Sequence, residues 1–385
     1  MSEAKRETDK ETVPQKGSLK EVASVFFKLG VIGFGGPAAH IAMMEAEIIE
    51  KRKWMDRQHF LDLMGATNLI PGPNSTEMTM HCGKERAGWP GLFVAGGAFI
   101  FPAVIMTLAF AWFYVKYGEL PAIAPIFAGI KPAVLAIIAG AIFKLGKKAL
   151  KNTTIGVIGA IVLVAAFLGL TEVVAILMGG FIALLWMGIT RDRATSIVPL
   201  FVFVAEATRS DVSTMKLFWV FLKVGSILFG SGYVLVAYLQ GELVEGLGWL
   251  TESQLLDAIA IGQFTPGPVL STATFVGYQV GGFAGAAVAT IGIFLPSFLF
   301  VLLLNPLVPM LRKSKAAAAF LDGVNIGAVA IMVAVTYALA ESTLIDWKAF
   351  LILAVALFFT FGPKKLSSVW IVLLGMVLGY ALGLI

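Results

Sequence analysis

The sequence predicts an all-α, polytopic integral membrane protein with two inverted-topology repeats and discontinuous helices. Hydrophobic residues make up 58% of the 385 positions and charged residues only 14%, whereas a soluble domain carries about 25% charged residues. Apolar stretches as long as a membrane span, roughly 20 residues, recur along the chain. Two Pro-Gly-Pro motifs, which begin at Pro71 and Pro266, interrupt such stretches 195 positions apart.

The same spacing reveals an internal duplication. It aligns Lys28 with Lys223 and Trp54 with Trp249, and the run from Lys28 to Pro73 has 14 identities in 46 aligned positions. Many of the identical residues are glycine, proline, tryptophan or charged, so shared hydrophobicity alone does not explain them. We therefore expect two repeats, at residues 19–194 and 215–385.

Predicted helices follow in order, and each ends at a glycine or proline break or at a charged cluster. Residues 1–18 have no apolar core and are expected to form a short disordered cytoplasmic tail. The first repeat is predicted to contain Leu19–Phe34, Ala38–Arg52, Asp56–Leu69, Asn74–Lys84, Leu92–Lys116, Ala122–Leu145, Thr154–Leu170 and Val173–Ile189. The linker 195–214 is expected to cross the membrane. The second repeat is predicted to contain Leu217–Phe229, Tyr233–Leu247, Glu252–Phe264, Val269–Tyr278, Phe283–Leu304, Ala317–Leu339, Trp347–Phe361 and Val369–Leu384.

Loop charges predict how the repeats are oriented. In the first repeat, positive clusters follow the second, fourth and sixth predicted segments, for example Lys144 to Lys151. In the second repeat the corresponding loops hold a single lysine, and the positive clusters lie in the alternate loops, at Arg312–Lys315 and Lys364-Lys365. Because cytoplasmic loops carry the excess of lysine and arginine, the two repeats are predicted to insert in opposite directions. Inverted repeats of this kind are typical of secondary transporters.

The helix breaks predict a shared anion-binding cavity. Non-helical backbone is tolerated at membrane depth only where it lines a cavity or is buried in protein. A helix that begins after such a break presents free N–H groups and its positive dipole end. The breaks involve Pro37, Pro71, Gly72, Pro73, Pro266, Gly267 and Pro268, and the predicted substrate residues beside them are Gly35, Gly36, Asn74, Ser75, Thr76, Gly230, Ser231, Ser271 and Thr272. The alternative is that the breaks are hinges or packing points without ligand contact.

Several charged residues are further candidates. Lys28 and Lys223 are repeat-paired cations before glycine breaks, so they are predicted to attract the anion, unless they extend to the interface instead. Asp62, Asp257 and Glu77 are possible coupling residues, and Thr272 occupies the position equivalent to Glu77. A polar helix start at the interface is the alternative for the two aspartates. The residues Glu47, Glu50, Glu242 and Glu245 are interpreted as the solvated face of amphipathic helices.

Other classes of protein are disfavoured. The sequence has no Walker loop, so transport is expected to use gradients rather than ATP hydrolysis on this chain. The single cysteine and three scattered histidines offer no metal or redox ligand set. We therefore expect no enzyme activity, no cofactor, no metal and no nucleic-acid partner.

At Phe34-Gly35-Gly36-Pro37, Trp54, the two Pro-Gly-Pro motifs and Phe229-Gly230-Ser231-Gly232, the chain resembles the chromate ion transporter family in its long-chain, two-domain form. This resemblance covers nearly the whole chain from Leu19. It implies a multi-pass carrier of the plasma membrane, the inner membrane in bacteria, that exports chromate through two antiparallel domains. We expect alternating access, with the oxyanion and the bilayer as partners, and leave a homodimer open. A carrier of sulfate or another oxyanion and a passive anion channel are the alternatives.

Overall fold

The computed structural model describes residues 17–67, 70–118, 120–121, 123–190, 213–229, 232–304 and 314–383, and these are helical apart from turns. The predicted all-α class is therefore confirmed for the described residues. The predicted tail before residue 17, nearly all of the linker 195–214, and the site residues Gly230 and Ser231 lie outside them.

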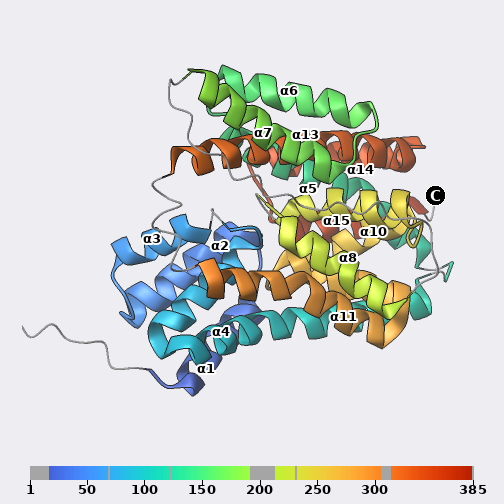
Figure 1. The fold of residues 1–385 in the computed structure, drawn as a ribbon. Coiled ribbons are helices and arrows are strands. Elements are labelled where there is room, and N and C mark those ends of the chain that lie inside the picture. The colour runs from blue at the N-terminus through green and yellow to red at the C-terminus, as the bar shows by residue number, and fades with distance from the viewer. Residues whose placement is uncertain are drawn as a thin grey trace, which may run out of the picture.

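The helices of the two halves repeat in the same order (Figure 1). The first half contains α1 (Leu19–Ile32), α2 (Gly36–Met44), the π-helical η1 (Glu45–Lys51), α3 (Arg57–Thr67), α4 (Asn74–Tyr117), α5 (Ala124–Ala149), α6 (Thr153–Phe167) and α7 (Glu172–Thr190). The second half contains α8 (Thr214–Ile227), the 3₁₀ turn η2 (Gly232–Val234), α9 (Leu235–Leu239), the π-helical η3 (Gln240–Gly246), α10 (Glu252–Phe264), the 3₁₀ turn η4 (Val269–Ser271), α11 (Thr272–Leu304), α13 (Lys315–Thr343), α14 (Trp347–Phe361) and α15 (Ser368–Gly383). The π-helical turns η1 and η3 begin 195 positions apart, as do α3 and α10. Even unusual local structure is thus duplicated.

Polar side chains begin many of these helices. The side chains of Ser18, Asn152, Ser314 and Asp346 each accept a hydrogen bond from a backbone N–H in the first turn of the helix that follows. Thr251 starts α10 with a reciprocal capping box, which satisfies two backbone N–H groups at once. These caps explain why the predicted and observed helix starts agree within a few residues.

The elements α4 and α11 each consist of two helices joined by a sharp turn. Ala87 and Gly88 separate the spans predicted at Asn74–Lys84 and Leu92–Lys116, and the backbones of Gly83 and Gly91 lie against each other, so the chain folds back at this turn. The equivalent turn in α11 lies at Gly281 and Gly282. Gly88 and Gly282 both have positive φ, which glycine adopts without a steric penalty. The helix boundaries predicted near the charged cluster and near the glycine pair are therefore confirmed.

The equivalent helices α5 and α13 run antiparallel, as inverted repeats require. The Lys151 ammonium, just after α5, lies 2.6 Å from Asp322 near the start of α13, whereas Gly146 lies beside Val329 further along α13. Residues with higher numbers in α5 therefore lie beside residues with lower numbers in α13, as expected for two antiparallel helices.

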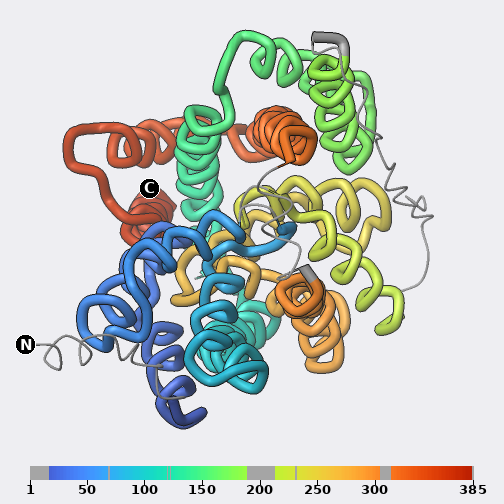
Figure 2. Tube along the Cα trace, turned by 60° about the vertical axis from the view of Figure 1, so that its left-hand side comes forward, coloured from blue at the N-terminus to red at the C-terminus, as the bar shows by residue number. Residues whose placement is uncertain are grey.

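The two repeats interlock through their last three helices. Helices α6 and α7 of the first repeat pack against α13, and α14 and α15 of the second repeat pack against α5. In Figure 2 the red C-terminal helices accordingly lie beside the green α5. Small residues allow the close crossings: Gly129 meets Gly375 and Gly179 meets Gly323. Such contacts let helix backbones approach closely in membranes, where hydrophobic residues gain little from leaving lipid.

Among the described residues, four helical segments are long and apolar enough, by length and composition, to cross a membrane: α4, α5, Val269–Leu303 and α13. The described residues also include four shorter apolar helices, α6 and α7, which pack on α13, and α14 and α15, which pack on α5. Helices α1 and α8 pack against α4 and α11 respectively, and α4 packs against α11 across the two repeats. This arrangement places both Pro-Gly-Pro breaks inside the molecule.

Candidate functional site

The two Pro-Gly-Pro breaks are held by the opposite repeat. The Gly72 N–H donates to the carbonyl of Leu228 at 2.7 Å, and the Gly267 N–H donates to the carbonyl of Gly33 at 2.8 Å. Both glycines have positive φ, +141° and +86°. The two hydrogen bonds are equivalent under the repeat, because both residues of each bond are displaced by 195 positions. Each break therefore satisfies a backbone N–H that would be costly to leave unpaired in a membrane.

Most of the hydroxyl groups after the breaks are hydrogen-bonded internally. The Ser75 hydroxyl lies 3.2 Å from His40 Nδ1, and the same ring contacts the Gly33 carbonyl at 2.8 Å through Nε2. The Thr107 hydroxyl donates to that of Ser271 at 3.2 Å, and the Thr272 hydroxyl donates to the Val269 carbonyl at 2.8 Å. Thr76 is also buried. In this conformation these side chains brace the breaks, and their role as substrate ligands stays a prediction.

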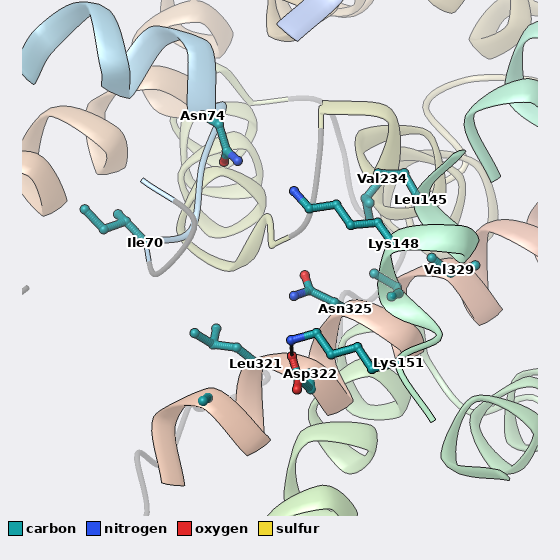
Figure 3. A pocket seen from close by; sticks show the side chains of 13 residues that line it. Ile70, Asn74, Leu145, Lys148, Lys151, Val234, Leu321, Asp322, Asn325 and Val329 are labelled. Carbon is teal, nitrogen blue, oxygen red and sulfur yellow. Dashed lines mark hydrogen bonds and ion pairs between the residues drawn. The ribbon is translucent and has the colours of Figure 1, made fainter. Parts of the chain in front are cut away.

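A cavity of about 330 Å³ opens beside the first break (Figure 3). Asn74, the first residue of α4, reaches it from the break, and Lys148 and Lys151 reach it from the end of α5. The opposite wall is the start of α13, where Asp322 and Asn325 lie. The remaining lining residues are mostly apolar: Ile70, Leu145, Ala149, Val234, Ala318, Leu321, Ala328 and Val329.

The polar ends of Asn74, Lys148 and Asn325 point into the same space in Figure 3. Lys151 forms an ion pair with Asp322, so its charge is balanced. Lys148 is exposed and takes part in none of the ion pairs of the described residues. The cavity thus combines an ammonium group with two amide side chains that can donate hydrogen bonds, a set that suits an oxyanion.

Lys28 and Lys223 do not line this cavity. Lys28 lies 3.5 Å from Glu47, and Lys223 is paired with Glu242, the repeat equivalent of Glu47. Their predicted role as substrate residues stays a prediction. The interpretation of Glu47 as part of a solvated face is wrong, because its side chain is only 8% exposed.

Glu47 is the centre of a charge cluster at the end of η1. Burial would raise the pKa of its carboxyl, but hydrogen bonds from Lys51 and Arg52 and the charge of Lys28 together lower that pKa below its usual value. Glu47 is therefore ionised at neutral pH and anchors three cations. The acid ties the π-helical turn to α1.

A second polar cluster lies where α10 meets α4 and α5. The Tyr114 hydroxyl donates to Asp257 at 2.7 Å, and Lys131 lies 4.0 Å from the same carboxylate. Lys131 also donates to the Ser253 hydroxyl at 2.6 Å. Helix α10 packs against α5 and α15 here, whereas its equivalent α3 packs against α4 and η1 and has no such packing against α13 in the described part of the chain. The two repeats are therefore in different local states.

The three predicted coupling residues are in different surroundings. Asp257 is buried in the cluster with Tyr114 and Lys131. Asp62, on the undocked α3, is half-buried and accepts a hydrogen bond from Gln58 at 3.4 Å. Glu77 is completely buried three residues after Asn74. The sequence could not distinguish these settings, because the surroundings of Asp257 and Glu77 depend on helices from the other repeat.

Sequence reasoning missed Lys148 and Asn325 as cavity residues. Lys148 belongs to a lysine cluster that predicts only how the chain is oriented in the membrane. Its position at the end of α5 is the feature of the sequence that could have indicated a cavity residue. Asn325 becomes a cavity residue only because α13 crosses α5 at that point.

Comparison with known proteins identifies similar chains over nearly the full length. A family model described as chromate transporter matches residues 20–184 and again residues 215–380. A probable chromate transport protein of Synechococcus elongatus is 33% identical over 379 residues, covering 94% of this chain and 95% of the relative. Chromate transport proteins of Cupriavidus metallidurans and Pseudomonas aeruginosa are 32% and 30% identical, covering 92% and 86% of this chain and 91% and 84% of their own lengths. No solved structure matches the chain.

Proposed function

The chain belongs to the chromate transporter family, and from this premise we propose that it exports chromate across the plasma membrane by alternating access. Family membership supports the coarser statement that it transports chromate across a membrane.

The observation that carries the proposal is the cavity beside the first break. Chromate is a tetrahedral dianion whose oxygens only accept hydrogen bonds. Lys148 supplies positive charge, and the amides of Asn74 and Asn325 supply neutral donors. Charged hydrogen bonds are the stronger ones, so Lys148 is assigned most of the attraction and the two asparagines most of the orientation.

The difference between the two repeats supports alternating access. Helix α10 is docked on α5, whereas α3 leaves the equivalent surface of α13 open to the cavity. Inverted repeats can exchange such states, so that α3 docks as α10 is released. The substrate would then face first one side of the membrane and then the other.

The lysines around the cavity support cytoplasmic loading. Lys144, Lys147, Lys148 and Lys151 gather at the end of α5 and just beyond it, and clusters of this kind mark the cytoplasmic side. An interior that is negative by 100 mV changes the energy of one charge by about 2.3 kcal/mol, so it favours the exit of a dianion by about 4.6 kcal/mol. A potential alone is therefore sufficient to drive export.

Transport by the purified protein tests the proposal. Proteoliposomes are loaded with labelled chromate or labelled sulfate, and efflux is measured at a set membrane potential. We expect saturable efflux and counterflow, with chromate and sulfate competing. Flux that rises with voltage without saturation or counterflow would indicate a channel, and movement of neither anion would refute the proposed function.

Lys148→Ala probes the cavity, with Lys147→Ala as the matched control. Loss of a charged hydrogen bond at a partly hydrated site costs about 1 kcal/mol, so the KM for chromate should rise about fivefold. Lys147 lies over the Phe143 ring and does not line the cavity, so its replacement should leave KM unchanged. Equal KM values for both variants would remove this cavity from the transport path.

A further inference from the structure

Glu77 is an acid enclosed in the protein beside the candidate oxyanion site. It lies in the first turn of α4, three residues after Asn74, and its exposed fraction is 0%. Residues three positions apart lie on the same side of a helix. Glu77 is therefore close to the cavity without lining it.

The carboxylate has no cationic partner. Glu77 forms no ion pair with any described residue, and the hydroxyl of Ser297 is the polar group beside its carboxylate. Ser297 lies on α11 and is itself fully buried. A Cβ atom added to Gly72 would collide with both groups, so the break, the acid and the hydroxyl form one compact unit.

Other titratable groups on the surrounding helices are engaged elsewhere or lie apart. Lys28 of α1 pairs with Glu47, and His40 of α2 contacts Ser75 and Gly33. Asp62 on α3 and His81 one turn further along α4 make no ion pair or hydrogen bond with the Glu77 carboxylate. Helix α11 has no Asp, Glu, Lys, Arg or His between Thr272 and Leu304. Among the residues that the structure describes, no charged side chain therefore pairs with Glu77.

The second repeat has no equivalent acid. Thr272 occupies the position of Glu77, and its hydroxyl is bonded to the Val269 carbonyl. Ala103 lies beside Gly267, as Ser297 lies beside Gly72. Only one of the two breaks thus has a titratable group.

An ionised carboxylate in such a place is unfavourable because it has lost water and gained no cationic partner, and one neutral hydroxyl does not compensate for that loss. A dianion in the adjacent cavity would disfavour the ionised form further, since like charges repel strongly where water is scarce. Oxyanion binding and protonation of Glu77 should therefore favour each other.

We infer that Glu77 is a proton-binding site of the transport cycle and that its proton travels with the oxyanion. This inference rests on the proposed function. On the loading side the carboxylate takes up one proton and becomes a carboxylic acid, and on the release side the same O–H bond breaks and returns the proton to water. One proton accompanies each dianion, so one net negative charge leaves per cycle. An interior-negative potential still favours export.

The test uses Glu77→Gln, whose neutral amide resembles the protonated acid in shape. Proteoliposomes contain a pH-sensitive dye and labelled chromate at alkaline pH, where chromate is a dianion. The wild type should move protons together with chromate, and acidification of the loading side should accelerate net flux. The variant should retain chromate exchange within about twofold but move no protons and lose the dependence on pH.

Glu85→Gln is the matched control, because Glu85 lies on the same helix, is exposed and faces His59. It should behave as the wild type in every measurement. Proton movement by folded Glu77→Gln would overturn the inference, as would loss of chromate exchange by this folded variant. Failure of the wild type to move chromate would instead refute the proposed function, so the two failures are distinguishable.

Discussion

Lys28 and Lys223 occupy equivalent positions, but their acids are held differently. Glu47 has three cationic partners, Lys28, Lys51 and Arg52. Glu242 is paired with Lys223 alone among the described residues, and the two side chains are only 13% and 26% exposed. Removal of Lys223 should therefore leave a nearly buried acid without a partner, whereas removal of Lys28 should not.

A double-mutant cycle tests this difference at the scale of the residue. Breaking a buried pair costs about 3–5 kcal/mol, and partial exposure reduces this to about 2 kcal/mol for Lys223→Ala. Lys28→Ala should cost less than half as much, and Lys223→Ala combined with Glu242→Ala should recover most of the loss. Thermal unfolding in detergent provides the measurement. Equal destabilisation by both single variants would contradict the account.

The same lysines also bear on transport. The sequence predicts that Lys28→Ala or Lys223→Ala abolishes chromate resistance without loss of membrane insertion. The ion pairs can produce this loss without direct contact between lysine and substrate. Each lysine connects α1 or α8 to the π-helical turn of its own repeat, so its removal loosens that connection. Normal resistance in both variants would remove these lysines from the mechanism.

At the scale of the element, the hairpin of η3 and α10 and that of η1 and α3 are the parts expected to move. The hairpins have the same helices in the same order, but only α10 is docked. Its contacts combine buried apolar residues such as Leu255 and Ile259 with polar ones, in which Lys131 meets Ser253 and Asp257 meets Tyr114. Polar contacts between helices can be exchanged for water when the surface opens, so a contact of this kind can open and close in each cycle.

Cross-linking distinguishes the two states of the hairpins. The equivalents of Ser253 and Lys131 under the repeat are Gln58 and Asn325. We expect cysteines at 131 and 253 to join through a short bifunctional reagent in the state described, and cysteines at 58 and 325 to join only in the opposite state. Chromate and an imposed potential should shift the two yields in opposite directions. Yields that rise and fall together would refute an exchange between repeats.

At the scale of the whole molecule, the fold is two copies related by inversion and locked together. The breaks bond reciprocally, Gly72 to Leu228 and Gly267 to Gly33, and the last helices of each repeat pack on the other. The central glycine N–H of each break is bonded by the other repeat, whereas neighbouring groups such as the N–H of Thr76 and of Ser271 bond within their own repeat. Each repeat therefore completes one hydrogen bond in the break of the other.

Accessibility labelling tests the inversion. Lys53 and Gly248 lie in equivalent turns, and both have positive φ, +51° and +66°. The native Cys82 is buried, so it should react little with a thiol reagent, and the labelling measured should come from cysteines placed at positions 53 and 248. Lys53→Cys should react with an impermeant thiol reagent only from the cytoplasmic side and Gly248→Cys only from the opposite side. Reaction of both from one side would disprove the inverted arrangement.

Much of the helical framework was predictable because its signals are local. Glycine and proline breaks, capping side chains and apolar length placed α10 and α14 at the residues observed. The sharp turns within α4 and α11 were predictable as well, since a charged cluster marks the first and a glycine pair marks the second. Glu47 was misassigned because its amphipathic position was visible in the sequence but the three cations around it were not.

The sequence alone determined the membrane class, the duplication, the opposite orientations suggested by loop charges and the positions of the breaks, because composition and spacing express these directly. The tertiary structure decided which residues meet: Asn74 with Lys148 and Asn325 around a cavity, Asp257 with Tyr114 and Lys131, and Glu77 with no charged partner. The physical reason is that burial and pairing depend on helices distant in the chain. Identical motifs in two repeats can therefore have different surroundings. In this protein the difference distinguishes the second repeat, in which α10 is docked on α5, from the first repeat, in which α3 is not docked on α13.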